Sequence, residues 1–517
     1  MRQGRLVTSS ATLRVTALAV ALTAAGPATP ALTQSLGRRL TARLDTLPLD
    51  RHVWGIAVLD RTGRLLFGRN PERLFMPASN TKLLVTAAAV WLLPPRWTAT
   101  TSLFAGGPIA GGVLLGDLVL YGGGDPTWTR RCYAVEPAPP EACTTDPTAQ
   151  LRRLASTLKR TGVTTVAGAI VGDGSYFEPT LTHPTWESDD LAWAFAAPVS
   201  GLGFNENTVV ATVTPGTKVG ERPSVSLEPD LPVLTVEVTA RTAGANTAVD
   251  LDWLRAPNGS GVTVSGTIPL GAPPDRSQLA VPDPNRFAAL AFARVLADSG
   301  IAVLGGVRST TDSLATRSVR ATAALATVTS RPVEDWVFAI NNVSQNWFAE
   351  TLLKQLGKQL GRAGSWPEGI NVERRFLIDS LGIDSTQVMA HDGSGLSAKN
   401  LASPLALATV LTTLRRHPRY PAFAAGIPQA GATGSLRNRF VATPVAGRVR
   451  AKTGSIGQVN SLSGYLEQDS ILVTKLRPCR IFSIQANHHT LPGRIMVQAI
   501  DSLVVETARG TPCWLDQ

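Results

Sequence analysis

Apolar and polar positions follow different periods along the chain, and the changes of period predict its elements. Between His52 and Phe67, apolar residues flank the polar turn Asp60-Arg61-Thr62-Gly63, which indicates two antiparallel strands joined by a hairpin. A helix is expected next, because the largely apolar run from Leu83 to Val90 stops before Pro94 and Pro95. The first part of the chain therefore predicts two strands followed by a buried helix.

The middle of the chain, from about Arg96 to about Thr329, has a different texture. Short runs of valine, threonine and leucine are broken by glycine and proline. This pattern is typical of strands and turns rather than helices. We therefore expect β-rich structure, in one or two domains, over residues 96–329.

Helical periodicity returns after Pro332 and gives way to strands near the end. One helix face is formed by the apolar residues Trp347, Phe348, Leu352, Leu353 and Leu356. A second helix is predicted over Leu405 to Leu414. Three strands and a closing helix then follow, at Arg448 to Ser455, Leu462 to Leu466, Arg480 to Ala486 and Ile495 to Ala508.

The two strands from the beginning and the three from the end can form one sheet covered by helices. The prediction is an α/β (α+β) fold with a five-stranded sheet. Residues 32–95 and 330–517 would make this domain, and residues 96–329 would be a long insertion into it.

The N-terminus has the features of a signal peptide. Arg2, Arg5 and Arg14 precede the apolar run Val15 to Ala25, and small residues and prolines follow as far as Ala31. An apolar core of this length suits export and cleavage and is too short to span a bilayer. We expect residues 1–31 to be removed and the mature protein to be periplasmic or extracellular, with a retained membrane anchor as the competing interpretation.

Composition and charge exclude several classes of protein. The 517 residues are 44% hydrophobic and 17% charged, as in folded multi-domain proteins rather than disordered chains. The net charge of +11 comes mostly from scattered arginines, so nucleic acid is not an expected partner, although an acidic wall polymer would be attracted. The six histidines and four cysteines include no His-Glu-x-x-His or Cys-x-x-Cys spacing, and no metal or cofactor is expected.

Ser79 and Lys82 form the first candidate for catalysis. They are three residues apart at the start of the predicted helix, which places a hydroxyl and an amine on one face and one turn. A serine needs a base to become a nucleophile, and a lysine serves only if burial or a nearby cation lowers its pKa. Considered alone, this pair is better explained by a helix-capping serine beside a surface lysine.

Two further motifs lie later in the chain. Lys452-Thr453-Gly454-Ser455 falls in a predicted strand, where a cation, a hydroxyl and backbone N–H groups could bind a carboxylate at a sheet edge. Ser344-Gln345-Asn346 precedes a predicted helix, so its first and third side chains can face one side. The competing interpretations are an exposed strand end and an ordinary helix cap.

The three motifs together resemble the penicillin-binding protein and serine β-lactamase superfamily, whose set is Ser-x-x-Lys, Ser-x-Asn and Lys-Thr-Gly in that order. The resemblance narrows to class C low-molecular-mass penicillin-binding proteins, the D-alanyl-D-alanine carboxypeptidase/endopeptidase family. It rests on Gly122-Gly123-Gly124-Asp125-Pro126-Thr127, on His391-Asp392-Gly393-Ser394-Gly395-Leu396-Ser397 and on the long insertion between Lys82 and Ser344. This family implies a penicillin-recognising, transpeptidase-like domain with an antiparallel sheet.

The resemblance also implies roles for the catalytic residues. Ser79 would attack the carbonyl between two D-alanines, and Lys82 would accept its proton. Ser344 would pass a proton to the leaving D-alanine, and Asn346 would orient Lys82 and the substrate amide. The N–H groups of Ser79 and Ser455 would form the oxyanion hole.

The substrate-binding residues and partners follow from the same resemblance. Lys452 and Thr453 would hold the terminal carboxylate, while Gly454 allows close backbone approach. The implied partners are peptidoglycan peptides, with β-lactam antibiotics as covalent inhibitors. Peripheral membrane contact stays open, and the oligomeric state is not given by the sequence.

Two other functions compete with this interpretation. A serine β-lactamase or esterase would share the acylation step, although the long insertion and the serine at Ser344, where some lactamases have tyrosine, argue against it. A catalytically silent wall-binding protein would keep only the fold, and the intact motifs argue against that. The sequence does not separate trimming of peptide ends from cleavage of cross-links.

The four cysteines fall into two local pairs, which suits an oxidising compartment. We predict disulfides Cys132–Cys143 and Cys479–Cys513, the first closing a short loop worth about 3 kcal/mol in the chain-entropy model. Peptide mapping without reduction should recover both linked pairs. Free thiols or crossed pairs would contradict the prediction.

Overall fold

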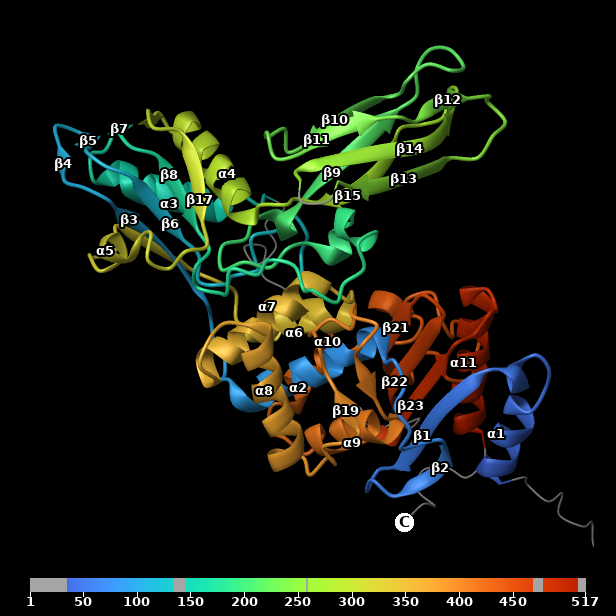
Figure 1. The fold of residues 1–517 in the computed structure, drawn as a ribbon. Helices are drawn as coiled ribbons and strands as arrows, with labels where there is room; N and C mark the ends of the chain where they lie inside the picture. Colours follow the sequence, from blue (N-terminus) through green and yellow to red (C-terminus); the bar gives the residue numbers. More distant parts are fainter. Residues whose placement is uncertain (1–34, 134–145, 257–258, 468–477, 510–517) are drawn as a thin grey trace, which may run out of the picture.

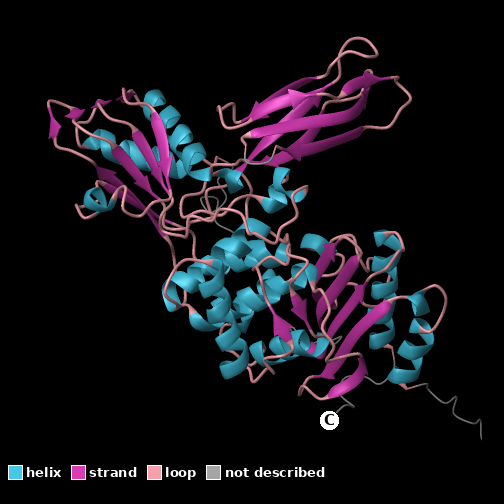
Figure 2. Cartoon of the chain, viewed as in Figure 1, coloured by secondary structure: helices cyan, strands magenta, loops and turns pink. Residues whose placement is uncertain are grey.

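The computed structural model describes residues 35–133, 146–256, 259–467 and 478–509. The predicted signal peptide, residues 1–31, lies outside these ranges. Within them, no helix is both long enough and apolar enough to cross a membrane. Figures 1 and 2 show a body rich in helices, formed by both ends of the chain, and two lobes formed by its middle.

The body contains the five-stranded antiparallel sheet expected from the sequence. Its strand order is β2-β1-β23-β22-β21, so the strands from the two ends of the chain meet where β1 pairs with β23. The strands are β1 (Val53–Asp60), β2 (Leu65–Arg69), β21 (Val449–Ile456), β22 (Val459–Glu467) and β23 (Pro478–Asn487). The strand β21 ends the order and therefore offers an edge.

Helices cover both faces of this sheet. On β1, Ile56 packs in a core with α1 (Leu36–Leu44) and α11 (Gly493–Ala508), whereas its neighbour Ala57 belongs to the opposite core. Successive side chains of a strand point to opposite faces, so β1 is apolar on both. The opposite core contains α2 (Lys82–Leu92), α6 (Val333–Asn342), α7 (Asn346–Leu360), α8 (Trp366–Arg375), α9 (Pro404–Leu414) and α10 (Tyr420–Gly426).

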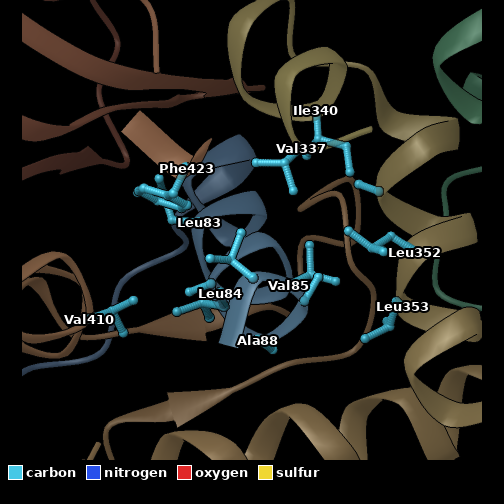
Figure 3. Close-up of a cluster of buried hydrophobic side chains, with 14 of the residues drawn as sticks. Leu83, Leu84, Val85, Ala88, Val337, Ile340, Leu352, Leu353, Val410 and Phe423 are labelled. Atoms are coloured by element: carbon cyan, nitrogen blue, oxygen red, sulfur yellow. The ribbon is translucent and has the colours of Figure 1, made fainter. Parts of the chain in front are cut away.

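The helix α2 lies in the middle of this second core (Figure 3). Every residue from Lys82 to Val90 is buried, as is typical of a helix that is apolar all round. Leu93 is extended, with φ −78° and ψ 150°, because the following Pro94 disfavours helical geometry before it. The side chains drawn around α2 in Figure 3 include Val337, Ile340, Leu352, Leu353, Val410 and Phe423.

The first lobe is built on a second five-stranded sheet, of order β17-β8-β6-β3-β18. These strands are β3 (Thr100–Ala105), β6 (Leu118–Tyr121), β8 (Ile170–Asp173), β17 (Val307–Thr310) and β18 (Ala326–Thr329). A small sheet beside it contains β4 (Ile109–Ala110), β5 (Val113–Leu114), β7 (Thr165–Val166) and β16 (Ala302–Val303).

The second lobe consists of two sheets. The first has β9 (Thr208–Thr214), β10 (Ser224–Glu228) and β15 (Asp275–Ala280). The second has β11 (Thr235–Val238), β12 (Arg241–Ala243), β13 (Asp250–Arg255) and β14 (Gly261–Pro269).

Three short elements lie elsewhere in the chain, namely α5 (Arg317–Arg320), β19 (Val388–Met389) and β20 (Leu401–Ala402).

The first lobe also contains two helices that the sequence pattern did not indicate. They are α3 (Ala149–Arg160), whose leucines are buried, and α4 (Pro284–Asp298). The start of α4 carries a local signal, because the side chain of Asp283 accepts from the N–H of Arg286 and Pro284 is the first helical residue. The middle of the chain is therefore rich in strands and also contains helices.

Cys132 and Cys479 are each disulfide-bonded. Their predicted partners, Cys143 and Cys513, lie outside the described residues, so the pairing stays a prediction.

Candidate active site

Ser79 lies in a 3₁₀ turn, Ala78–Thr81, that leads directly into α2. No side chain caps the start of α2. Thr81 precedes α2, but its hydroxyl donates instead to the carbonyl of Ala78 at 2.9 Å. The hydroxyl of Ser79 is 2.9 Å from Nζ of Lys82, so the two groups of the first motif meet as the helical spacing predicted.

The amine of Lys82 is fully buried and has three polar contacts. It lies 2.6 Å from Oδ1 of Asn346 and 2.6 Å from the carbonyl oxygen of Ser394, in addition to the Ser79 hydroxyl. Both of these oxygens can only accept, so they take the two N–H groups of a neutral amine. The lone pair of the neutral amine then faces the hydroxyl of Ser79, which is the geometry that a general base needs.

Burial lowers the pKa of Lys82 to about 7. The carboxylates of Glu350 and Asp392 oppose this effect, because negative charge favours the ammonium form. Desolvation is therefore the main cause, whereas the sequence had also suggested a neighbouring cation. The low pKa allows a substantial neutral fraction of Lys82 at neutral pH.

Ser344 and Asn346 occupy the junction between α6 and α7. Ser344 has φ 63°, an uncommon left-handed conformation, and its hydroxyl accepts from Nζ of Lys452 at 2.8 Å. The helix cap is formed by the residue between them, Gln345, whose side chain accepts from the N–H of Trp347. The cap interpretation of this motif therefore applies to Gln345 alone.

The amide of Asn346 is oriented from both sides. Its Nδ2 donates to the carbonyl of Phe195 at 2.8 Å, which leaves Oδ1 facing Lys82. Phe195 belongs to the middle of the chain, so the inserted residues contribute directly to the geometry around the amine of Lys82.

The third motif lies on the edge strand β21. Lys452 is completely buried, and burial together with nearby Lys82 holds its pKa well below the ordinary lysine value. The N–H of Ala451 points away from β22, because it donates to the carbonyl of Pro428. Strand alternation places the N–H groups of Thr453 and Ser455 on the same outer side. Backbone donors thus point outward from this edge of the sheet.

Gly454 lies where β21 passes the turn that carries Ser79. A Cβ at this position would be 2.3 Å from Oγ of Ser461, 2.7 Å from the carbonyl oxygen of Pro77 and 2.9 Å from Nδ2 of Asn80. Only glycine allows this approach without displacing one of the two segments.

A cleft of about 320 Å³ opens beside these groups. Five predicted residues line it, namely Ser79, Ser344, Thr453, Gly454 and Ser455. The other three, Lys82, Asn346 and Lys452, are hydrogen-bonded to them directly or through one another. All eight residues therefore come together in one place, and their catalytic roles remain proposals.

Several residues of the site were not identified from the sequence. Arg439 and Asn460 also line the cleft. Behind Lys82, the buried carboxyls of Glu350 and Asp392 accept backbone N–H groups of the loop 392–397. Asp392 additionally accepts from Nε1 of Trp186, which again comes from the inserted residues. Among the described residues, no cluster of acidic, histidine or cysteine side chains is arranged to hold a metal ion.

The profile of the D-Ala-D-Ala carboxypeptidase 3 (S13) family matches residues 36–506. A D-alanyl-D-alanine carboxypeptidase of an Actinomadura species is 29% identical over 506 residues, which cover 93% of this chain and 87% of the relative. The D-alanyl-D-alanine carboxypeptidase DacB of Haemophilus influenzae is 25% identical over 81% of this chain and 83% of the relative.

The fold has a counterpart among solved structures. The crystal structure of penicillin binding protein 4 from Haemophilus influenzae superposes with a TM-score of 0.76 at 23% identity. The match covers 90% of this chain and 99% of the other. The expected penicillin-recognising fold, with its sheet, helices and long insertion, is confirmed.

We predict that Gly454→Ala disrupts the site more than the fold. The added methyl group would separate β21 from the turn that carries Ser79, so labelling by fluorescent penicillin should fall about tenfold or more, which corresponds to 1.4 kcal/mol. Gly244→Ala is the control, because Gly244 has no left-handed φ and a Cβ there meets nothing within 4 Å. Equal labelling of the two variants would contradict the role of the close approach.

Proposed function

The chain belongs to the D-Ala-D-Ala carboxypeptidase 3 (S13) family, and on this basis we propose that it hydrolyses the D-alanyl-D-alanine bond of peptidoglycan stem peptides through an acyl-enzyme on Ser79. The expected enzyme class, a serine-type D-Ala-D-Ala carboxypeptidase, is confirmed by this membership. The observation that carries the mechanism is the contact of a buried, low-pKa Lys82 amine with the Ser79 hydroxyl.

In the first step, the neutral amine of Lys82 takes the proton of Ser79 as Oγ attacks the carbonyl carbon between the two D-alanines. The N–H groups of Ser79 and Ser455 stabilise the negative charge that develops on the carbonyl oxygen. This role is supported by the position of the Ser455 N–H on the outer side of β21. The result is a tetrahedral intermediate covalently bound to Ser79.

The substrate lies along the open edge of β21, as an extended peptide adds to a sheet. Its terminal carboxylate meets Lys452 and the hydroxyl of Thr453. A carboxylate favours the ammonium form of Lys452, which burial disfavours. A substrate ending in a free carboxylate is thereby preferred over an uncharged one.

Collapse of the intermediate expels D-alanine, whose amine needs a proton. Ser344 relays to it the proton that Lys82 took from Ser79, because its hydroxyl bonds Nζ of Lys452 and faces the same cleft, and Lys82 becomes neutral again. Water then attacks the acyl group while the neutral Lys82 accepts its proton, and Lys82 returns this proton to Oγ of Ser79 as the acyl bond breaks. Trimming of peptide ends and cleavage of cross-links would share all these steps.

We place the protein in the periplasm or outside the cell. The disulfide-bonded state of Cys132 and Cys479 supports an oxidising compartment. β-Lactams, which carry a reactive amide and a carboxylate, would acylate Ser79 in the place of the peptide.

We predict that the purified protein releases free D-alanine from a peptide ending in D-Ala-D-Ala, and that Ser79→Ala abolishes the release. The same variant should gain no mass from a β-lactam in intact-mass analysis. Digestion of purified peptidoglycan also tests cross-link cleavage, which would convert dimeric muropeptides to monomers. Rapid turnover of the β-lactam without D-alanine release would instead indicate a lactamase, and no labelling would indicate a silent binder.

A further prediction concerns the pH dependence of acylation. The base must be neutral, so the acylation rate should rise with pH through an apparent pKa of about 7 and fall below it, as Lys82 becomes protonated. Lys82→Arg keeps the charge and cannot deprotonate, so acylation measured by stopped flow should nearly disappear.

Lys452→Arg is the matched control for this experiment. Its proposed task is to bind a carboxylate, which arginine can also do, so this variant should raise KM more than it slows acylation at saturation. Near wild-type acylation by Lys82→Arg would show that the general base lies elsewhere.

A further inference from the structure

Glu350 is a buried carboxyl that the mechanism above does not use. It lies on α7, one helical turn after Asn346, and its side chain is 0% exposed. A carboxyl group is rarely fully buried without a specific partner, because desolvation strongly disfavours its charged form. Its contacts show what it holds in place.

Both oxygens of Glu350 accept hydrogen bonds from the loop behind the base. Oε1 accepts from the N–H of Ser394 at 2.6 Å, and Oε2 accepts from the N–H of Gly393 at 3.0 Å. Oε2 also accepts from Nε1 of Trp366 at 2.7 Å. A single carboxyl thereby joins α7, α8 and two consecutive peptide groups of the loop.

The carbonyl of Ser394 is one of the two acceptors that hold the amine of Lys82. Because Glu350 holds the N–H groups of Gly393 and Ser394, it restrains the loop directly before that carbonyl. The other acceptor, Asn346, is carried by the same helix as Glu350. The direction of the Lys82 lone pair therefore depends on α7 through both contacts.

We propose that Glu350 is a positioning residue for acylation, which holds the Ser394 carbonyl against Nζ of Lys82 so that the neutral amine faces Ser79. The inference rests on the proposed function. Among the described residues, Glu350 forms no hydrogen bond with Ser79, and it does not line the cleft.

The charge of Glu350 gives this role a second effect. Burial is the main cause that raises the pKa of Glu350 to about 7, and the negative charge of nearby Asp392 adds to it. The negative charge of Glu350 in turn favours the ammonium form of Lys82. The other charged groups that interact with this pair are Glu373 on α8, Lys354 on α7 and Lys452 on β21. Removing the charge of Glu350 should therefore lower the pKa of Lys82.

The test is Glu350→Gln, measured by stopped-flow acylation with a fluorescent penicillin across pH. The amide cannot accept from all three donors, because its NH₂ group must face at least one of them. We expect the maximal acylation rate to fall about tenfold or more. The acidic limb of the pH profile should also move to lower pH, a shift that a purely structural role would not produce.

Glu373→Gln is the matched control. Glu373 belongs to the same group of buried carboxyls, but its side chain forms no hydrogen bond with the described loop 392–397 or with Lys82. Burial raises the pKa of Glu373 to about 8. It is mostly protonated at pH 7, so glutamine closely replaces it. This variant should keep the wild-type maximal rate.

Glu350→Asp separates position from charge. It keeps the carboxylate but shortens its reach, so the maximal rate should fall while the acidic limb moves less than in Glu350→Gln. If thermal unfolding shows that Glu350→Gln is not folded, Trp366→Phe serves as the second variant, because it removes one hydrogen-bond donor to the same carboxyl. That variant should shift the limb in the same direction, because loss of a hydrogen bond to the anion raises the pKa of Glu350.

Wild-type rate and an unshifted limb in a folded Glu350→Gln would overturn the inference. A slower rate with an unshifted limb would also overturn it as stated, since it would reduce Glu350 to a structural residue. Both outcomes require a wild-type protein that acylates. Absence of acylation in the wild type would instead mark the failure of the proposed function.

Discussion

The burial of one amine, that of Lys82, is the constraint on which the site depends. Keeping a lysine neutral near pH 7 rather than charged in water costs roughly 5 kcal/mol, as the difference between 10.5 and about 7 implies. The apolar packing of α2 offsets this cost, because every residue from Lys82 to Val90 lies in the core. The proposed general base therefore belongs to the helix that forms the middle of the hydrophobic core.

The inserted residues are part of that structure rather than an appendage. Phe195 orients the amide of Asn346, and Trp186 holds Asp392 in the loop behind Lys82. Lys354 of α7 likewise donates to the carbonyl of Thr180 and lies 3.4 Å from the ring centre of Trp366. The two oxygens that accept from the amine of Lys82 thus depend on contacts between the body and the middle of the chain. Sequence separation hides this dependence, since the partners are more than a hundred residues apart.

The sequence predicted those features that arise from local spacing. Ser79 and Lys82 meet because a helical turn brings them together, and the strands around Lys452 follow from alternation. The sequence did not identify Glu350 as part of the site, because Glu350 and Lys354 form an i,i+4 pair of opposite charges, which is typical of an exposed helix face. Both residues are 0% exposed here, and only tertiary packing distinguishes the two cases. The helix α4 was missed although Asp283 and Pro284 mark its start, because its surroundings are dominated by strand patterns.

The turn that carries Ser79 is held between two glycines from distant segments. On one side, a Cβ at Gly454 would lie 2.7 Å from the carbonyl oxygen of Pro77. On the other, a Cβ at Gly395, whose φ is 81°, would lie 1.9 Å from the carbonyl oxygen of Ala78. Ala78 itself has φ 47°, so the turn keeps an unfavourable conformation that its neighbours impose. The proposed nucleophile is thus set by backbone contacts on both sides, and the proposed reaction would need little rearrangement of the site.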